Sequence, residues 1–192
     1  MRVLFASGID GFCHRYGVLH WAEQLATQGI PSTAWAHTDP RLATALTSHD
    51  VLVLYRVPDA PWIRHLLARA TALGRPTVFA VDDLIVVPEL TDVPPLRGRS
   101  DAERRLWHDG VRRYRRTLEA CDAFLATTEP IAAVGRRLGI PTHLQRCGVS
   151  SAELAVGAAA RAGSTATGGT VRLGYFSGTA THDDDLAAIA LA

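Results

Sequence analysis

The chain contains no lysine: all 20 of its basic residues are arginine, against 19 acidic residues, which gives a formal net charge of +1. A balanced charge provides no overall electrostatic case for nucleic-acid binding, so we expect no nucleic-acid partner. A biased coding composition is the simplest explanation for the arginine preference. Planar guanidinium groups also suit phosphate and carboxylate ligands better than ammonium groups do.

Cysteine is scarce as well, with three residues, Cys13, Cys121 and Cys147, spread over 192 positions. The odd number and the absence of a Cys-x-x-Cys pair exclude a disulfide framework and a thiolate zinc site. The apolar run at the N-terminus is too short for a signal peptide, and no run of about 18 apolar residues exists to span a membrane. We therefore expect a cytoplasmic protein without a bound metal.

What the chain does have is enough apolar residues, 47% of the total, to fill a core. Short apolar segments alternate with helical patterns from residue 2 to about residue 150. The segments expected to be strands are 3–6, 32–36, 51–55, 77–81, 123–126 and 142–144. This alternation predicts an α/β fold, a Rossmann-like doubly wound parallel sheet with helices on both faces, as the first domain over residues 1–150.

The segment 77–81 is uncharged throughout and ends in two acids, Asp82 and Asp83. Ligands of open parallel sheets bind at the carboxyl ends of the strands, which makes these acids candidates for a site. Adjacent side chains leaving a strand point in different directions, so we expect one of the two in the site rather than both. Arg56 ends the strand 51–55 at the same edge, where it either orients a ligand anion or, as the default, pairs with an acid.

A glycine-containing turn follows the first strand. Backbone N–H groups of the turn around Gly8 and Gly11, together with a helix N-terminus, favour an anion. A tight turn that needs positive φ explains the same glycines equally well. The third glycine of the dinucleotide fingerprint is missing. His14 and Arg15 lie at the start of the next helix, where they either face the site or are solvated.

A long arginine-rich helix is expected over residues 101–118, because Ser100 and Glu103 have the spacing of a capping box. One face carries apolar residues. The other face is expected to carry six arginines: Arg104, Arg105, Arg112, Arg113, Arg115 and Arg116. A solvated face is the first interpretation, and contact with an anionic membrane surface is the second.

The composition changes after residue 150. Small residues dominate 157–169, so residues 151–170 are expected to form a flexible linker. Residues 171–176 then predict a new strand, followed by a turn with Gly178 and Thr179. This last piece, 171–192, is too small to bury a core alone, so we interpret it as the truncated start of a second Rossmann-like domain.

These residues resemble a known family. The Ser7-Gly8 turn, Cys13-His14-Arg15-Tyr16 and the two strands that end at Arg56 and Asp82-Asp83 look like the N-terminal half of GT-B glycosyltransferases of family 4 (group 1). The run Gly174-Tyr-Phe-Ser-Gly-Thr-Ala-Thr-His-Asp183 is similar to the opening of that family's second domain and is the most specific match.

The resemblance implies retaining transfer of a sugar from a sugar nucleotide to a hydroxyl of an acceptor glycan or lipid, without a metal or other cofactor. It assigns catalysis to His14 and Asp82, with a second domain holding most of the donor. The implied acceptor- or phosphate-binding residues are Gly8, Arg15, Arg56, Asp83 and Thr128, and the implied donor-side residues are Gly178 and Thr179.

Two features depart from the family pattern. Cys147-Gly148-Val149-Ser150 stands where the family commonly has Asn-Gly-Val-Asp, and the paired glutamates of the donor domain do not occur before residue 192. We therefore expect the chain to be inactive without the missing C-terminal domain. By the membrane interpretation of the arginine-rich helix, the protein would be peripheral at the inner face of the membrane.

Two other functions stay open. One is a non-catalytic α/β binding module for a glycan, a lipid headgroup or a protein. The other is a nicotinamide-dependent oxidoreductase. The incomplete glycine fingerprint argues against it, and so do His37 and Asp39, which are poor substitutes for the acidic residue expected at the end of the second strand.

Overall fold

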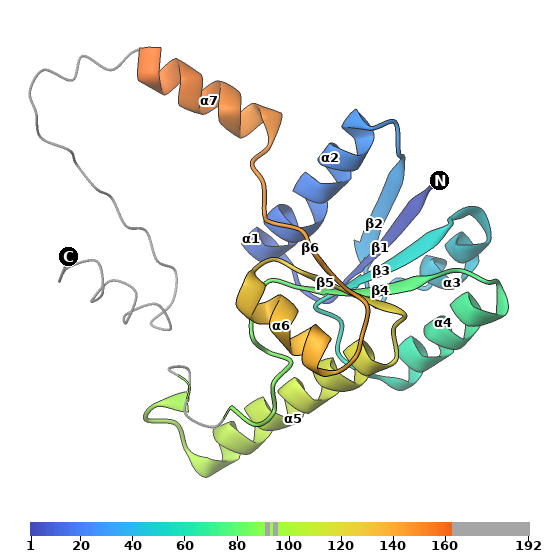
Figure 1. Cartoon of the computed structure of the whole chain (residues 1–192), viewed down its shortest axis with the longest axis vertical. Helices are drawn as coiled ribbons and strands as arrows, with labels where there is room; N and C mark the ends of the chain where they lie inside the picture. Colours follow the sequence, from blue (N-terminus) through green and yellow to red (C-terminus); the bar gives the residue numbers. More distant parts are fainter. Residues whose placement is uncertain (91–92, 94–95, 163–192) are drawn as a thin grey trace, which may run out of the picture.

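The computed structural model describes residues 1–90, 93 and 96–162, and Figure 1 traces the whole chain. The strand expected at 171–176, and Gly178 and Thr179 with it, lie outside these residues. The same holds for residues 163–170 of the expected linker.

Six parallel strands form one sheet in the order β2-β1-β3-β4-β5-β6. The strands are β1 (Val3–Ser7), β2 (Ser32–Ala36), β3 (Val51–Tyr55), β4 (Thr77–Val81), β5 (Ala123–Ala126) and β6 (Thr142–Leu144). The predicted α/β, Rossmann-like parallel sheet is thus confirmed. The strand order reverses between β1 and β3, and in sheets of this kind the ligand crevice lies outside the carboxyl ends of the strands at that reversal.

Helices connect successive strands, as parallel pairing requires. The first connection is one continuous helical segment made of α1 (Gly11–His14), the π-helical turn η1 (Arg15–Leu19) and α2 (His20–Thr27). The others are α3 (Arg41–Ala45) with the short 3₁₀ turn η2 (Leu46–Ser48), α4 (Pro61–Ala72), α5 (Asp101–Glu119) and α6 (Glu129–Arg137), and α7 (Ser151–Ala162) follows β6.

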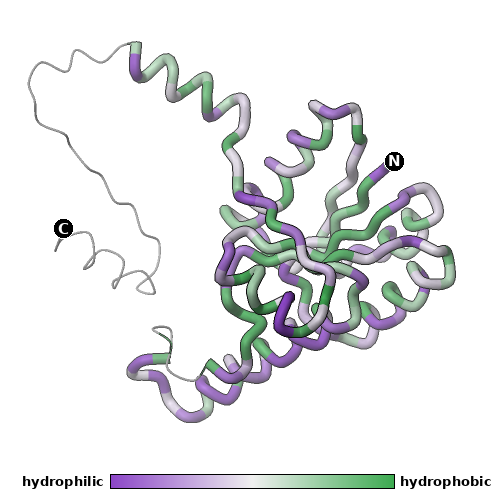
Figure 2. The backbone as a smooth tube through the Cα atoms, viewed as in Figure 1, coloured by the Kyte–Doolittle hydropathy of each residue, from purple (hydrophilic) through white to green (hydrophobic). Residues whose placement is uncertain are grey.

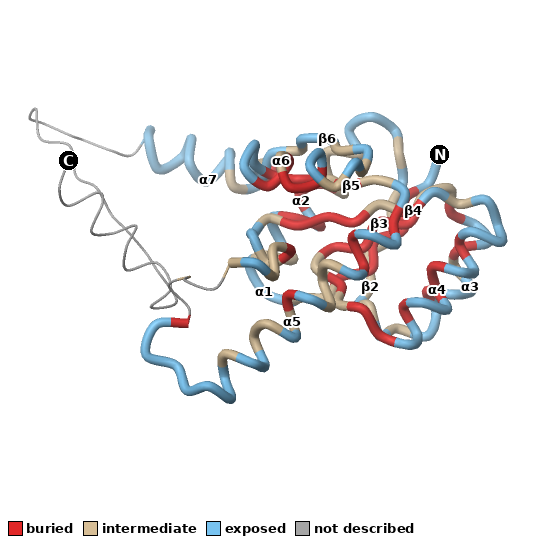
Figure 3. The backbone as a smooth tube through the Cα atoms, turned by 60° about the horizontal axis from the view of Figure 1, so that its bottom comes forward, coloured by how far each residue is buried: buried red, intermediate tan, exposed pale blue. Residues whose placement is uncertain are grey.

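The two faces of the sheet are covered unequally. One face presents Leu4, Leu54 and Phe79 to a large core that α3, α4, α5 and α6 cover. The other presents Phe5 and Val53 to a smaller core closed by η1 and α2. The right-handedness of the crossovers explains this unequal cover. The connection from β1 to β2 runs toward one edge of the sheet and all later connections run toward the other edge, so the helices of the later connections lie on the opposite face. Figure 3 shows the central strands β3 and β4 as mostly buried, whereas the edge strands β2 and β6 are partly exposed.

The arginine-rich helix α5 begins with the predicted capping box between Ser100 and Glu103. Figure 2 shows it as a mainly hydrophilic helix. The prediction that its arginines form a solvated face is wrong for Arg113: its Nε donates to the backbone oxygen of Asp59 at 2.8 Å. Arg116 contacts the Asp59 carboxylate at 3.0 Å. The buried Asp59 carboxylate explains the contact of Arg116, because a buried charge needs a cationic partner. None of the described helices has both the length and the apolar content to cross a membrane.

The expectation of a flexible linker is wrong for residues 151–162, which form helix α7. Its side chains pack poorly against the rest of the chain, and Leu154 and Val156 are largely exposed. Figure 1 shows α7 leading away from the sheet after the loop that follows β6. Ser150 and Glu153 explain why a helix begins here: Ser150 Oγ accepts from the Glu153 backbone N–H, and the Glu153 carboxylate accepts from the Ser150 N–H.

Candidate functional site

Gly8 joins the ends of β1 and β3 at the strand-order reversal. Its N–H donates to the Tyr55 carbonyl oxygen at 2.8 Å. A Cβ at this position would lie 1.9 Å from the Arg56 carbonyl oxygen, so only glycine lets the two backbones come this close. Among the N–H groups of the turn that were expected to favour an anion, that of Gly8 is therefore used within the protein. The contribution of Gly8 is close packing.

His14 lies beside the same turn, held by Ser7. The Ser7 hydroxyl donates to the Ile9 carbonyl oxygen at 2.7 Å, and His14 Nδ1 lies 3.0 Å from that hydroxyl oxygen. Because the hydroxyl proton is used for Ile9, the hydroxyl oxygen accepts from His14 Nδ1–H. The neutral imidazole then carries its proton on Nδ1, and its Nε2 is the atom that can accept a proton or a hydrogen bond.

Arg56 is the centre of the charges at this edge. It adopts a φ of 50°, a left-handed conformation that is uncommon for a residue with a side chain. Its guanidinium group pairs with Asp82 and, at 3.3 Å, with Asp83. The default expectation that Arg56 pairs with an acid is therefore confirmed. Burial opposes the charge, but the two carboxylates outweigh it and raise the pKa of Arg56 above its ordinary value.

The two acids differ in environment. The Asp82 side chain is 17% exposed, whereas that of Asp83 is 61% exposed. Asp82 thus belongs to the enclosed part of the edge and Asp83 to its solvent side. Sequence reasoning assigned both residues to this edge and expected one of them in the site; the difference in exposure favours Asp82.

Tyr55 and Cys13 belong to this edge too, although no sequence pattern marks them as site residues. Burial, followed by the charge of Asp82, raises the pKa of the Tyr55 hydroxyl far above its ordinary value. Burial also raises the pKa of the Cys13 thiol. Gly17, in the π-helical turn η1, makes room for the Tyr55 ring, since a Cβ there would lie 2.1 Å from it. The sequence signal that could have identified Tyr55 is its position as the single tyrosine at the end of an aliphatic strand.

Arg15 does not join these groups. Its Nη2 lies 3.0 Å from the Glu153 carboxylate, at the start of α7. Thr128 stands at the N-cap position of α6, after β5, where its exposed side chain makes no capping hydrogen bond. Both residues therefore lie at element ends, as expected, but Arg15 is directed to a neighbouring helix.

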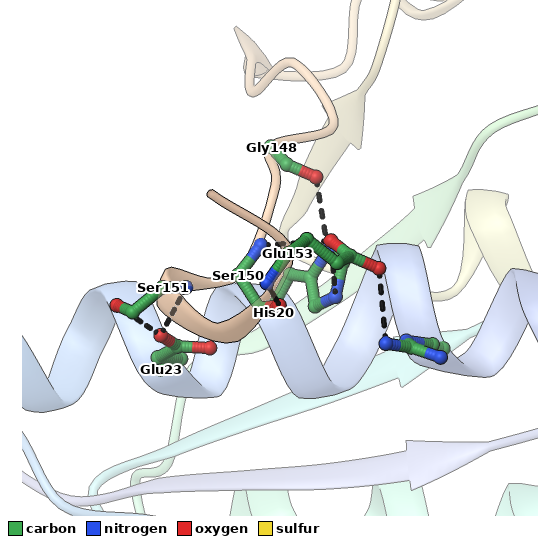
Figure 4. A network of polar contacts seen from close by, with 7 residues as sticks. His20, Glu23, Gly148, Ser150, Ser151 and Glu153 are labelled. Carbon is green, nitrogen blue, oxygen red and sulfur yellow. Dashed lines mark hydrogen bonds and ion pairs between the residues drawn. The ribbon is translucent and has the colours of Figure 1, made fainter. Parts of the chain in front are cut away.

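Figure 4 shows how α7 is attached to α2. The buried His20 places Nδ1 2.9 Å from the Gly148 carbonyl oxygen and Nε2 3.4 Å from the Glu153 carboxylate. Glu23 accepts two hydrogen bonds from Ser151, from the backbone N–H at 2.9 Å and from the hydroxyl at 2.6 Å. The chain is thus held firmly where it leaves the sheet.

A hollow of about 360 Å³ opens beside the glycine turn. Gly8, His14 and His37 are among the residues that line it, with the ends of β1 and β2. Arg56 and Asp82 are not among the lining residues of this hollow, but the Arg56 backbone packs against Gly8, which lines it. In the described part of the chain, no cluster of three or more histidine, cysteine or acidic residues could hold a metal ion.

Comparisons with known proteins add little. No family model matches the chain, and no curated protein matches it. Among solved structures, a hydroxyethylthiazole kinase protein from Pyrococcus horikoshii OT3 is similar to this chain, with 18% identity and a TM-score of 0.38. The match covers 72% of this chain and 46% of that protein, so the chain spans less than half of its length. A similarity at this level carries no argument about function.

Proposed function

We propose that residues 1–150 form the acceptor-side domain of a retaining glycosyltransferase that uses a sugar nucleotide, and that this chain alone does not catalyse transfer. The observation that carries the proposal is the arrangement at the strand-order reversal. There Gly8 and His14 line one hollow, and Gly8 packs against the backbone of Arg56, whose side chain pairs with Asp82. The resemblance of the sequence to GT-B family 4 supplies the reaction.

His14 is suited to orient an acceptor hydroxyl. With its Nδ1–H donated to Ser7, its Nε2 can accept the hydrogen bond of a hydroxyl group and later its proton. Positioning the nucleophile in this way lowers the entropic part of the barrier. The donor diphosphate needs cationic or N–H partners as it leaves. Most of these would come from the second domain, because Arg56 and Arg15 are paired with carboxylates here.

That pairing favours a second candidate, a non-catalytic α/β module that binds a glycan, a lipid headgroup or a protein at the same edge. An arginine whose charge is already balanced by Asp82 contributes less to binding a phosphate than a free one. In a module, the polar edge would need only hydrogen-bonding groups for neutral hydroxyls. A nicotinamide-dependent oxidoreductase gains no support from the edge, because the Gly8 N–H is used within the protein.

The test is a transfer assay with two polypeptides, residues 1–192 and the product of the reading frame continued beyond residue 192. Each is incubated with a panel of radiolabelled sugar nucleotides and acceptor glycans and lipids. We expect transfer by the longer polypeptide only, and its loss in the His14→Ala variant. Robust turnover by residues 1–192 would contradict the proposal that this chain alone does not catalyse transfer. A longer polypeptide that binds glycans and transfers nothing would favour the binding module.

A further inference from the structure

A second hollow, of about 590 Å³, lies between α3 and α4 and adjoins the candidate site. His37 and Thr38, in the loop after β2, line both hollows, so the two are neighbours on either side of one loop. A volume of this size suits a small organic group. The function proposed above assigns nothing to it.

The surfaces that this hollow offers are aromatic and aliphatic. The Trp62 side chain, on the first turn of α4, is 47% exposed although it is among the largest apolar groups of the chain. It stacks on His37, with ring centroids 6.2 Å apart and planes 30° from parallel. Leu42 and Leu66, both buried, contribute to the lining from α3 and α4.

Several polar groups around the hollow make contacts within the protein. Asp39 pairs with Arg41 at 2.6 Å, and Arg69 Nε donates to the Ala43 carbonyl oxygen at 2.6 Å. His37 Nδ1 lies 3.2 Å from the Ser7 carbonyl oxygen. Asp39, the one acid among the lining residues, is thus already paired and offers no free carboxylate to a cation, whereas a planar ring would find the faces of Trp62 and His37.

We propose that this hollow binds a planar aromatic group of the acceptor, stacked on Trp62. The hydroxyl-bearing part of the same acceptor then reaches past His37 into the hollow beside Gly8 and His14. The assignment of the group to an acceptor rests on the proposed function. The aromatic binding site itself rests only on the geometry of α3, α4 and the loop between β2 and α3. Offset stacking of aromatic rings supplies affinity beyond the burial of apolar area.

The experiment uses residues 1–192 and matched glycosides of glucose, galactose and mannose, each as the methyl, cyclohexyl and phenyl compound. Binding is measured by calorimetry and by the indole N–H signal of Trp62 in nitrogen-15 NMR spectra. For at least one sugar, we expect the phenyl glycoside to bind about tenfold more tightly than the methyl one and to move the Trp62 signal. Trp62→Ala should remove the phenyl advantage, and Trp62→Phe should retain part of it.

Trp107→Ala, which removes a partly buried tryptophan of α5 that does not line the hollow, is the control and should leave the phenyl advantage unchanged. Circular dichroism checks that each variant is folded, which is expected because Trp62 is half exposed. Equal binding of phenyl and cyclohexyl compounds, or a phenyl advantage that survives Trp62→Ala, would overturn the proposal. Aryl binding at Trp62 without sugar transfer by the longer polypeptide would refute the glycosyltransferase and leave the aromatic site standing.

Discussion

Gly8 and Arg56 touch through their backbones, and a single added carbon on residue 8 would lie 1.9 Å from the Arg56 carbonyl oxygen. This contact joins the ends of β1 and β3 where the strand order reverses. It also sets the position of Arg56, which adopts a φ of 50° and directs its guanidinium group to Asp82. Close packing at Gly8 is thus linked to the charges of the candidate site through the Arg56 backbone.

Replacing Gly8 by alanine should therefore disturb both stability and the site. We expect Gly8→Ala to lower the free energy of unfolding by about 1–3 kcal/mol, because the added methyl meets backbone atoms that cannot rotate away. Gly110→Ala is the control, since Gly110 lies in α5 with open space around its Cα. That variant should gain roughly 0.5–1 kcal/mol. Urea unfolding measures both, and equal effects of the two substitutions would refute the packing argument.

Asp82 and Asp83 should differ in their importance to stability. Asp82→Asn leaves the nearly buried Arg56 guanidinium with only the exposed Asp83 as a partner, and we expect a loss of about 2–3 kcal/mol. Asp83→Asn should cost less than about 1 kcal/mol, because that ion pair is solvated. Combining Asp82→Asn with Arg56→Met should recover part of the loss. If Asp83→Asn proves the more damaging change, Asp83 and not Asp82 is the main partner.

The tautomer of His14 can be measured directly. Because Ser7 accepts from Nδ1, we expect nitrogen-15 NMR of the neutral ring to show the proton on Nδ1. Ser7→Ala removes the acceptor and should shift the ring toward the Nε2–H form, which is commoner for a free imidazole. Thr27→Ala, which removes a distant hydroxyl on α2, is the control. A proton on Nε2 in the unaltered protein would contradict the role given to His14.

Attachment of α7 should weaken in acid. Hydrogen bonds from Ser150, with the charges of His20 and Arg15, hold the pKa of Glu153 below its ordinary value of 4.5. The hydroxyl and N–H of Ser151 lower the pKa of Glu23 likewise. A depressed carboxyl pKa contributes stability above its unfolded value and loses it as the pH falls through the folded value.

We therefore expect the helical Cα chemical shifts of residues 151–155 to be constant between pH 7 and 5 and to decrease below pH 4.5. The double variant Glu23→Gln/Glu153→Gln should show smaller helical shifts already at pH 7 and little change in acid. A transition of the same size in that variant would show that other groups hold α7.

Local signals predicted the fold well. The uncharged run 77–81 is strand β4 with the expected bounds, and the Ser100–Glu103 spacing gave the start of α5. The same capping-box spacing occurs at Ser150 and Glu153, yet small residues after it suggested a linker. Helix α7 could therefore have been predicted from the sequence.

Other features depend on contacts between distant residues. The π-helical turn that contains Gly17 fits around Tyr55, 38 positions away in the chain, and no periodicity reveals it. Arg15 pairs with Glu153, and nothing in the sequence around Arg15 indicates this distant partner. Short-range patterns identify which residues end a strand. They do not determine which charges meet across that edge.

The most direct test of the central claim is an NMR titration of residues 1–192 with nucleotide sugars and, separately, with candidate saccharide acceptors. Amide shifts are mapped onto the sheet. The account predicts acceptor-induced shifts concentrated at Gly8–His14 and His37, with nucleotide sugars adding weaker shifts at Arg56 and Asp82. Shifts confined to other surfaces, or none with any ligand of either kind, would contradict it.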